Sequence, residues 1–338
     1  MGDPRSADNR SFTNHARSKD RMNRTARRLA ALLAALLLVA SIVTAPARAA
    51  RVVTWNLLAY NEVAANARRN ATLTVLPSLN PDVMIVQELL TAPAADSFAA
   101  FLRTSMPTKR WIGGSSTFLL ATQSAIFYDS LQFTHSNLSA IATGGPRQVL
   151  VALLRPNGYK ANAASFRLYS MHLKAGNGAG GTSPPSDSST RTLECTNLRT
   201  TLNNVNTTVV GTNFILGGDT NFYGSWEGGY QRLTESQASN NGRLFDPLNM
   251  PGTWHTNSAY ALYDTQCPQN SPMTSDFSGG GMDDRFDMIL SSPSMQDGSG
   301  LDYATNGYVA FGNDGYHFNS DLNSNGYNLA VGLDVATA

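Results

Sequence analysis

Short apolar runs alternate with polar segments along this chain, and the pattern predicts a protein rich in strands. Continuous apolar runs at residues 82–88 and 213–216 are typical of strands buried on both faces, whereas residues 165–173 alternate as a half-buried strand does. The strands that the pattern predicts are 51–58, 82–88, 116–128, 148–154, 165–173, 213–216 and a run within 283–290.

Helical spacing of apolar residues predicts fewer helices, placed between these strands. They are expected at residues 62–76, 96–102 and 190–205. The strand, helix and strand at residues 51–88 form a βαβ-like start, with Pro77 and Pro81 bracketing the exit from the helix. Residues 174–189 and 224–282 have little periodicity and predict long loops.

Residues 1–49 carry the features of an export signal. A basic region precedes an apolar run at residues 29–43, and Ala47-Arg48-Ala49 suits cleavage after Ala49. An uncleaved anchor is the alternative, although the run is short for a bilayer span. We therefore expect a signal peptide at residues 1–49 and one domain at residues 50–338, in a secreted or periplasmic protein with no membrane span after signal removal.

The charge balance changes once the N-terminal segment is set aside. The chain has 25 Lys and Arg against 24 Asp and Glu, but residues 1–50 hold nine of the basic and three of the acidic residues. The remaining 16 basic and 21 acidic residues give a balance of −5, which does not indicate general electrostatic capture of nucleic acid. Cys195 and Cys267 allow one disulfide or two free thiols.

Polar side chains stand at or near the ends of five predicted strands. They are Asn56, Glu88, His172, the pair Asp219 and Asn221, and Asp287. Turn chemistry explains one such residue, but it does not explain five ends whose residue types bind metals or transfer protons. Oxygen ligands of this kind suit magnesium or calcium rather than zinc, and magnesium takes much of its shell from water and phosphate. The pattern therefore indicates phosphoryl chemistry.

Five short motifs carry a family resemblance. They are Thr54-Trp55-Asn56, Val86-Gln87-Glu88, Tyr169-Ser170-Met171-His172, Gly218-Asp219-Thr220-Asn221 and Asp284-Arg285-Phe286-Asp287. In this order they resemble the endonuclease/exonuclease/phosphatase superfamily, which includes deoxyribonuclease I, abasic-site endonucleases, neutral sphingomyelinases and inositol-phosphate phosphatases. The stretch 253–287 resembles exported bacterial members. The resemblance implies an α/β (α+β) fold, a four-layer αββα sandwich whose two mainly antiparallel sheets pack face to face between helices.

The resemblance also implies a metal site and a water site. Glu88 would bind the divalent ion, Mg²⁺ or else Mn²⁺ or Ca²⁺, with Asn56 and Asp219 beside it. Asp219 and Asn221 would position the attacking water and the phosphate oxygens. Asn56, Asn221 and Arg147 are the candidate substrate contacts.

The remaining roles concern proton transfer. His172 would contact the phosphate or protonate the leaving group, and Asp287 would orient a general-base histidine. Arg285 is expected to be structural and to pair with Asp283 or Asp284.

The family pattern breaks at its last strand, which reads close to Ser-Asp-His-x-Pro-Val and supplies the general-base histidine. The nearest partial match, residues 320–322, lacks both His and Pro. We expect a sequence truncated before that strand and weakly active or inactive as it stands; a degenerate member that has lost the base is the alternative. His317 is expected to be a loop or substrate-side residue, and His135 and His255 surface or loop residues.

Taken together, these features predict an exported, metal-dependent phosphodiester hydrolase. A nuclease that cuts DNA or RNA by histidine-activated attack of water on phosphorus comes first, so the expected partner is a phosphodiester substrate, nucleic acid in particular. A sphingomyelinase-like phospholipid phosphodiesterase or a phosphomonoesterase is the alternative within the class. A catalytically dead binding module is the alternative from another class. The oligomeric state is left open.

Overall fold

The computed structural model describes residues 49–176, 186–205, 213–271 and 279–338. The chain divides into two units, Met1–Ala49 and Ala50–Ala338. The expected signal peptide lies outside the described residues apart from Ala49, so the fold below is that of the second unit. Within the described residues, no helix combines the length and apolar character needed to cross a membrane.

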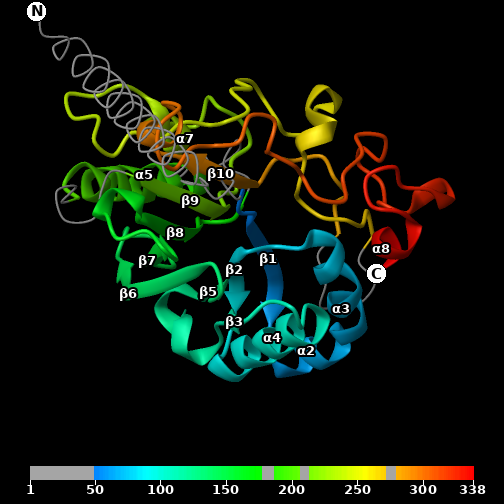
Figure 1. Ribbon diagram of the computed structural model, residues 1–338. Coiled ribbons are helices and arrows are strands. Elements are labelled where there is room, and N and C mark those ends of the chain that lie inside the picture. The colour runs from blue at the N-terminus through cyan, green and yellow to red at the C-terminus, as the bar shows by residue number, and fades with distance from the viewer. Residues whose placement is uncertain (1–48, 177–185, 206–212, 272–278) are drawn as a thin grey trace, which may run out of the picture. The chain divides into compact units, whose positions relative to one another are not determined.

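The described strands form two five-stranded sheets (Figure 1). Sheet A has the order β1-β2-β5-β3, with β4 also paired to β5, and its strands are β1 (Val52–Tyr60), β2 (Val83–Leu89), β3 (Trp111–Ile112), β4 (Phe118–Leu119) and β5 (Ser124–Asp129). Sheet B has the order β10-β9-β8-β7-β6, and its strands are β6 (Phe133–Ile141), β7 (Val149–Pro156), β8 (Phe166–His172), β9 (Asn213–Asp219) and β10 (Asp287–Ser291). Within the described sheets, β1 pairs with β2 and β8 with β9 in parallel, while the other pairs are antiparallel.

Helices cover the outer face of each sheet, which gives four layers (Figure 1). The longer described helices are α2 (Glu62–Ala67), α3 (Arg69–Leu79) and α4 (Ala92–Ser105) beside sheet A, and α5 (Asp187–Asn203) and α7 (Gly228–Thr234) beside sheet B; α8 (Leu333–Thr337) contacts α3. Three apolar clusters fill the three interfaces. Phe98 of α4 and Leu198 of α5 are buried in the two outer clusters, and Ile85 and Leu168 belong to the cluster between the sheets. The predicted four-layer sandwich is confirmed.

Caps and local breaks move several predicted boundaries. The helix expected at 62–76 is two helices that break at Arg68, and α3 continues through Pro77 before Asn80 ends it in the left-handed conformation. The helix expected at 96–102 starts at Ala92 because Thr91 accepts a hydrogen bond from the backbone N–H of Ala94.

Other elements escaped the sequence pattern. The strand expected at 116–128 is divided into β4 and β5, because Gln123 turns the chain in the left-handed conformation. Helix α7 lies inside the stretch 224–282 that was predicted as loop. It buries only Gly229 and Leu233, which is too little for an apolar period to show in the sequence.

A buried ion pair ties the helices on sheet B to the loops that follow β8 and β9. Arg191 donates two hydrogen bonds of 2.9 Å to the Glu227 carboxylate, and both side chains are 0% exposed. Arg191 also donates to the carbonyl of Lys174 at 2.9 Å, while Glu227 accepts from the backbone N–H of Tyr223 at 2.9 Å. Because Lys174 follows β8 and Tyr223 follows β9, one ion pair fixes both loops.

Replacing Arg191 by Ala is expected to lower the free energy of unfolding by about 3–5 kcal/mol, because Glu227 would keep a buried charge without its partner. Urea denaturation measures the change. The matched control is Arg232→Ala, which breaks the exposed pair with Glu235 and should cost about 0–1 kcal/mol. Equal losses in the two variants would contradict the prediction.

Candidate active site

Three strand ends, those of β2, β8 and β9, meet the break in the β1–β2 register that follows Asn56, and this brings their polar residues together. Parallel pairing places His172 of β8 beside Asp219 of β9. In the other sheet, Asn56 of β1 pairs with Gln87 of β2, the residue before Glu88. The Asn56 amide nitrogen donates to Glu88 Oε1 at 3.0 Å and to Asp219 Oδ2 at 2.9 Å. Since Asn56 belongs to sheet A and Asp219 to sheet B, these bonds join the two halves of the cluster.

His172 is buried against both carboxylates. Its Nε2 lies 3.6 Å from Asp219 Oδ2 and 3.9 Å from Glu88 Oε1, and its side chain is 3% exposed. Burial, and then the charge of Arg147, lowers the pKa of His172 to about 3. The imidazole is therefore neutral at neutral pH, and its Nδ1 has no hydrogen-bond partner among the described residues.

Two carboxylates face each other across β9 and β10. Asp219 and Asp287 are directly opposite in the antiparallel register. Burial, followed by the charge of Glu88, raises the pKa of Asp219 to about 6, although hydrogen bonds from Asn56 and Asn221 oppose the shift. Burial and the charge of Asp219 raise the pKa of Asp287 well above its ordinary value. Asp287 Oδ1 has no hydrogen-bond partner in the described part of the chain.

Arg147 supplies the positive charge of the cluster. It precedes β7, and its Nε and Nη2 donate to the carbonyls of His172 and Leu173 at 3.3 and 3.1 Å. Burial lowers its pKa, whereas the charges of Glu88 and Asp219 raise it. The half-buried guanidinium thus lies close to the carboxylates of Glu88 and Asp219.

Residues other than glycine adopt left-handed backbone conformations around the site. Glu88 has φ 58°, Asn221 has φ 52°, and Leu58 and Ala59 have φ 47° and 45°. Glu88 is held there because its Oε2 accepts from the backbone N–H of Ala59 at 2.7 Å. Each such residue costs on the order of 1–3 kcal/mol, and such strain persists where the surrounding structure fixes it, often at functional sites.

The structure brings the predicted site residues into one cluster: Asn56, Glu88, Arg147, His172, Asp219, Asn221 and Asp287. Their separate catalytic roles stay predictions. Asn221 closes the cluster, since its backbone and side-chain nitrogens donate to Asp219 Oδ1 at 3.1 and 2.8 Å.

Glu194 is a residue of this region that the sequence analysis missed. It is 1% exposed on α5, and its Oε2 accepts from the backbone N–H of Lys174 at 3.0 Å. A Cβ on Gly145 would lie 1.8 Å from Glu194 Oε1, so the loop that leads to Arg147 passes directly over this carboxylate. The sequence did contain a sign that Glu194 is buried, because it stands four residues before Leu198, on the apolar stripe of the helix.

Two expectations outside the cluster are settled. Arg285 pairs with neither Asp283 nor Asp284; its Nη1 and Nη2 donate to Asp246 at 2.7 and 2.8 Å. Cys195 is a buried free thiol, so the two cysteines are not joined to each other. The ion pair of Arg285 with Asp246 could not be predicted, because the two residues are far apart in the sequence.

His317 is a structural histidine. It is 1% exposed, its Nδ1 lies 2.8 Å from Asp314 Oδ1, and its Nε2 lies 3.1 Å from the carbonyl of Ser324. Both ring nitrogens are therefore engaged, which leaves neither for general-base chemistry.

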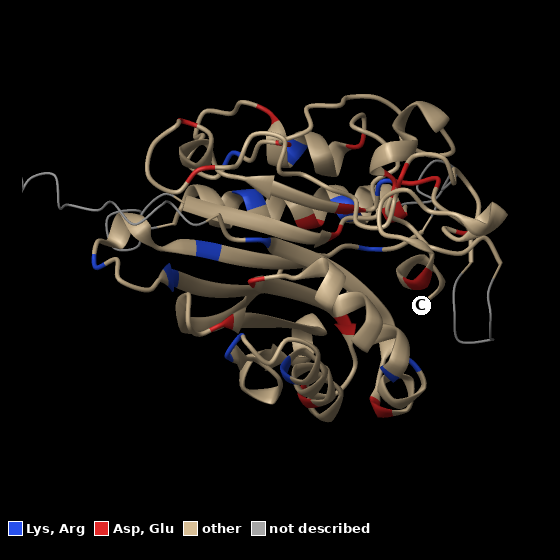
Figure 2. Cartoon of the chain, turned by 45° about the vertical axis from the view of Figure 1, so that its right-hand side comes forward, with Lys and Arg blue, Asp and Glu red and all other residues tan. Residues whose placement is uncertain are grey.

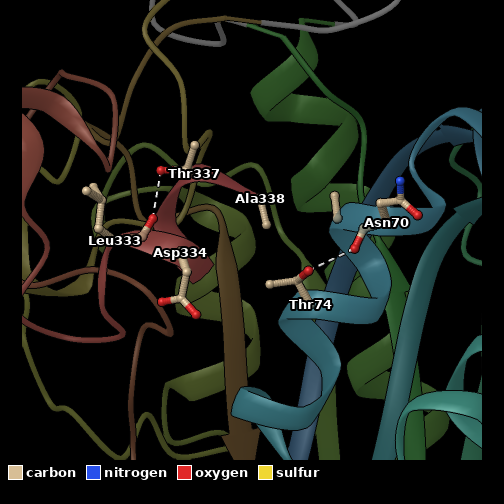
Figure 3. Close-up of a pocket in the computed structure, with 7 residues that line it drawn as sticks. Asn70, Thr74, Leu333, Asp334, Thr337 and Ala338 are labelled. Atoms are coloured by element: carbon tan, nitrogen blue, oxygen red, sulfur yellow. Dashed lines mark hydrogen bonds between the residues drawn. The ribbon is translucent and has the colours of Figure 1, made fainter.

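A groove between α3 and α8 contains none of the cluster residues. Its volume is about 520 Å³, and Asn70 and Thr74 of α3 face Leu333, Asp334 and Thr337 of α8 across it (Figure 3). The candidate site is therefore the strand-end cluster and not this groove.

No family model matches the sequence, and no curated protein matches it. Among solved structures, the human Nocturnin catalytic domain with bound sulfate shares 18% identity at a TM-score of 0.46, over 72% of this chain and 83% of that one. D. rerio TDP2 complexed with single-strand DNA product shares 17% at 0.45, over 71% and 82%. An endonuclease/exonuclease/phosphatase family protein from Bacteroides thetaiotaomicron shares 15% at 0.43, over 72% and 83%. The chemistry has to come from its own residues.

The buried Glu194 predicts a pH dependence of stability. Burial raises its pKa above the ordinary value of 4.5 despite the nearby cations, so the folded state keeps this proton when the unfolded state has released it. Its contribution to stability is therefore fully present below about pH 4.5 and is lost as the pH rises through the folded pKa. As the pH rises from 4.5 to 8, the free energy of unfolding should therefore fall less in Glu194→Gln than in the wild type.

Urea denaturation at several pH values between 4.5 and 8 measures this difference. Glu62→Gln, at an exposed position of α2, is the control and should follow the wild type. The same pH dependence in Glu194→Gln and wild type would rule the assignment out.

Proposed function

We propose that this chain is an exported, divalent-metal-dependent phosphodiester hydrolase that acts on nucleic acid. One observation carries the proposal: Asn56 joins Glu88 and Asp219 across the two sheets, within 4 Å of a buried neutral histidine. Carboxylates, amides, an imidazole and a guanidinium at one point are the groups that phosphoryl transfer requires. The export part rests on the sequence of residues 1–49.

The donor set fits a hard divalent cation. Glu88 and Asp219 keep side-chain exposures of 21% and 13%, so their oxygens remain accessible at the mouth of the cluster. Their mutual repulsion contributes to the raised pKa of Asp219, and a cation between them would relieve it. In the ranges that the structure describes, no three His, Cys, Asp or Glu side chains form a ready metal cage. One or two carboxylates completed by water and phosphate is the usual magnesium arrangement.

Glu88, with Asn56 and Asp219 beside it, would hold that ion. When bound, the ion supplies charge that stabilises the pentacoordinate phosphorus and lowers the pKa of a bound water. Arg147 lies where it can contact the phosphate, and His172, neutral at neutral pH, can donate a hydrogen bond to the phosphate or accept the proton of the attacking water. Asp219 and Asn221 would orient that water.

Charge favours a phosphodiester over a phosphomonoester. A diester carries one negative charge, whereas a monoester carries up to two at neutral pH. The cluster offers a single guanidinium, that of Arg147, among its residues. The motif that ends in His172 supports the same choice, because it resembles the nuclease and sphingomyelinase branches.

Nicking of supercoiled plasmid tests the function, because one cut per molecule is enough to be seen. With magnesium the full chain should nick DNA slowly, since no imidazole pairs with Asp287 among the described residues. Glu88→Gln and His172→Ala should each lower the rate by about 10²-fold or more. His135→Asn, on the edge strand β6, should keep the rate.

Three results would contradict the proposal. Cleavage of sphingomyelin without DNA nicking would assign a lipid substrate. Tight DNA binding without turnover would assign a binding module. Nicking that survives chelation of divalent ions would show that the reaction does not depend on a metal.

A further inference from the structure

The loops that precede β10 bury three carboxylates away from the strand-end cluster. Asp264, at the end of a 3-10 helix (Ser258–Tyr263), is 0% exposed, and Asp283 and Asp284 are 8% and 2% exposed. The surroundings are poor in positive charge, since residues 257–338 contain ten Asp and no Lys or Glu, with Arg285 as their single arginine (Figure 2).

The three carboxylates differ in how their oxygens are satisfied. Asp284 accepts from His255 Nδ1, which lies 3.0 Å from each of its oxygens, and Asp283 accepts from Thr256 Oγ1 at 3.3 Å. Neither oxygen of Asp264 has a hydrogen-bond partner among the described residues. Arg285 lies nearby, but both its Nη atoms donate to Asp246.

An unpartnered buried carboxylate beside two others needs a compensating positive charge. The backbone N–H groups of Thr265 and Gln266 both donate to the carbonyl of Asp284, at 2.8 and 3.1 Å, so the segment that follows Asp264 lies against Asp284. In agreement with this placement, burial, followed by the charges of Asp284 and Asp283, raises the pKa of Asp264 to about 7. Burial also raises the pKa of Asp284 to about 6. Such a group becomes stable by taking a proton or by binding a cation.

We propose that Asp264 and Asp284, with Asp283 beside them, form a second cation site that binds a hard divalent ion of the calcium type. Calcium accepts six to eight oxygens in flexible geometry, including mono- and bidentate carboxylates, backbone carbonyls and water. No three acidic, imidazole or thiol side chains form a ready cage in the described residues, so carbonyls and water would complete the shell. His255 would orient the Asp284 carboxylate through its hydrogen bond, as residues that contact a metal ligand without binding the metal do.

The site would connect two loops that support the strand-end cluster. The backbone N–H of Thr265 donates to the carbonyl of Asp284 at 2.8 Å, and Thr265 Oγ1 accepts from the backbone N–H of Asp287 at 2.8 Å. A cation on Asp264 and Asp284 would therefore fix the segment that places Asp287.

Thermal unfolding of the full chain, first freed of metal by chelation, tests the site without any substrate. Calcium at about 100 times its dissociation constant should raise the wild-type Tm by about 5 °C. Glu88→Gln should keep the calcium-dependent shift, and Asp264→Asn should lose it. The readout does not depend on hydrolysis, so failure of this inference and failure of the proposed function are distinguishable.

Three outcomes would overturn the inference: no shift in the wild type, a shift that survives Asp264→Asn, or a shift lost in Glu88→Gln. If Asp264→Asn alone raises the Tm without calcium and calcium leaves the wild type unchanged, the carboxylates share a proton instead. Should Asp264→Asn fail to fold, terbium luminescence on Glu88→Gln decides: one calcium-competed terbium per chain supports the site, and none refutes it.

Discussion

The carboxamide of Asn56 donates to carboxylates from two different sheets, and the geometry of the candidate site depends on that bridge. Its two hydrogen bonds hold Glu88 and Asp219 at one point, although the strands that carry them meet only by face-to-face packing. A second polar bond lies just below, where Gln87 Nε2 donates to Ser170 Oγ at 3.0 Å between the sheets. The spacing is set by apolar contact, since a Cβ on Gly217 would lie 2.8 Å from Ile85 Cδ1.

Electrostatics at this bridge work against the folded state. Glu88, Asp219 and Asp287 gather near a single guanidinium, that of Arg147, and the pKa shifts of both aspartates record the cost. The neutral His172 adds no compensating charge at neutral pH. The three apolar clusters stabilise the fold around this site, and this electrostatic cost arises at the end of the sandwich where the candidate site lies.

The sequence predicted the parts of this protein that depend on local periodicity or on short motifs. The buried strand at β2 and the alternating strand at β8 were found because their patterns are unambiguous, and the five motifs located the cluster. Features that depend on distant partners could not be predicted. Arg285 was assigned to its sequence neighbours, but its partner Asp246 comes from another loop.

Short or weakly apolar elements also escaped prediction. Helix α7 buries two residues, and its role becomes visible only through the ion pair of Glu227, just before it, with Arg191. The roles of Glu194 and His255 likewise depend on which carboxylates and loops lie beside them in space. A single sequence does not contain that information.

Sheet A is formed entirely by residues up to Asp129, and sheet B by residues from Phe133 onward. Each half of the cluster is therefore carried by one continuous stretch of chain, and the two stretches contribute different ligands. Neither half can assemble the site alone, so the complete site forms only after both have folded and docked. Under the proposed function, a chain in which only one of the two stretches has folded would have no hydrolase activity.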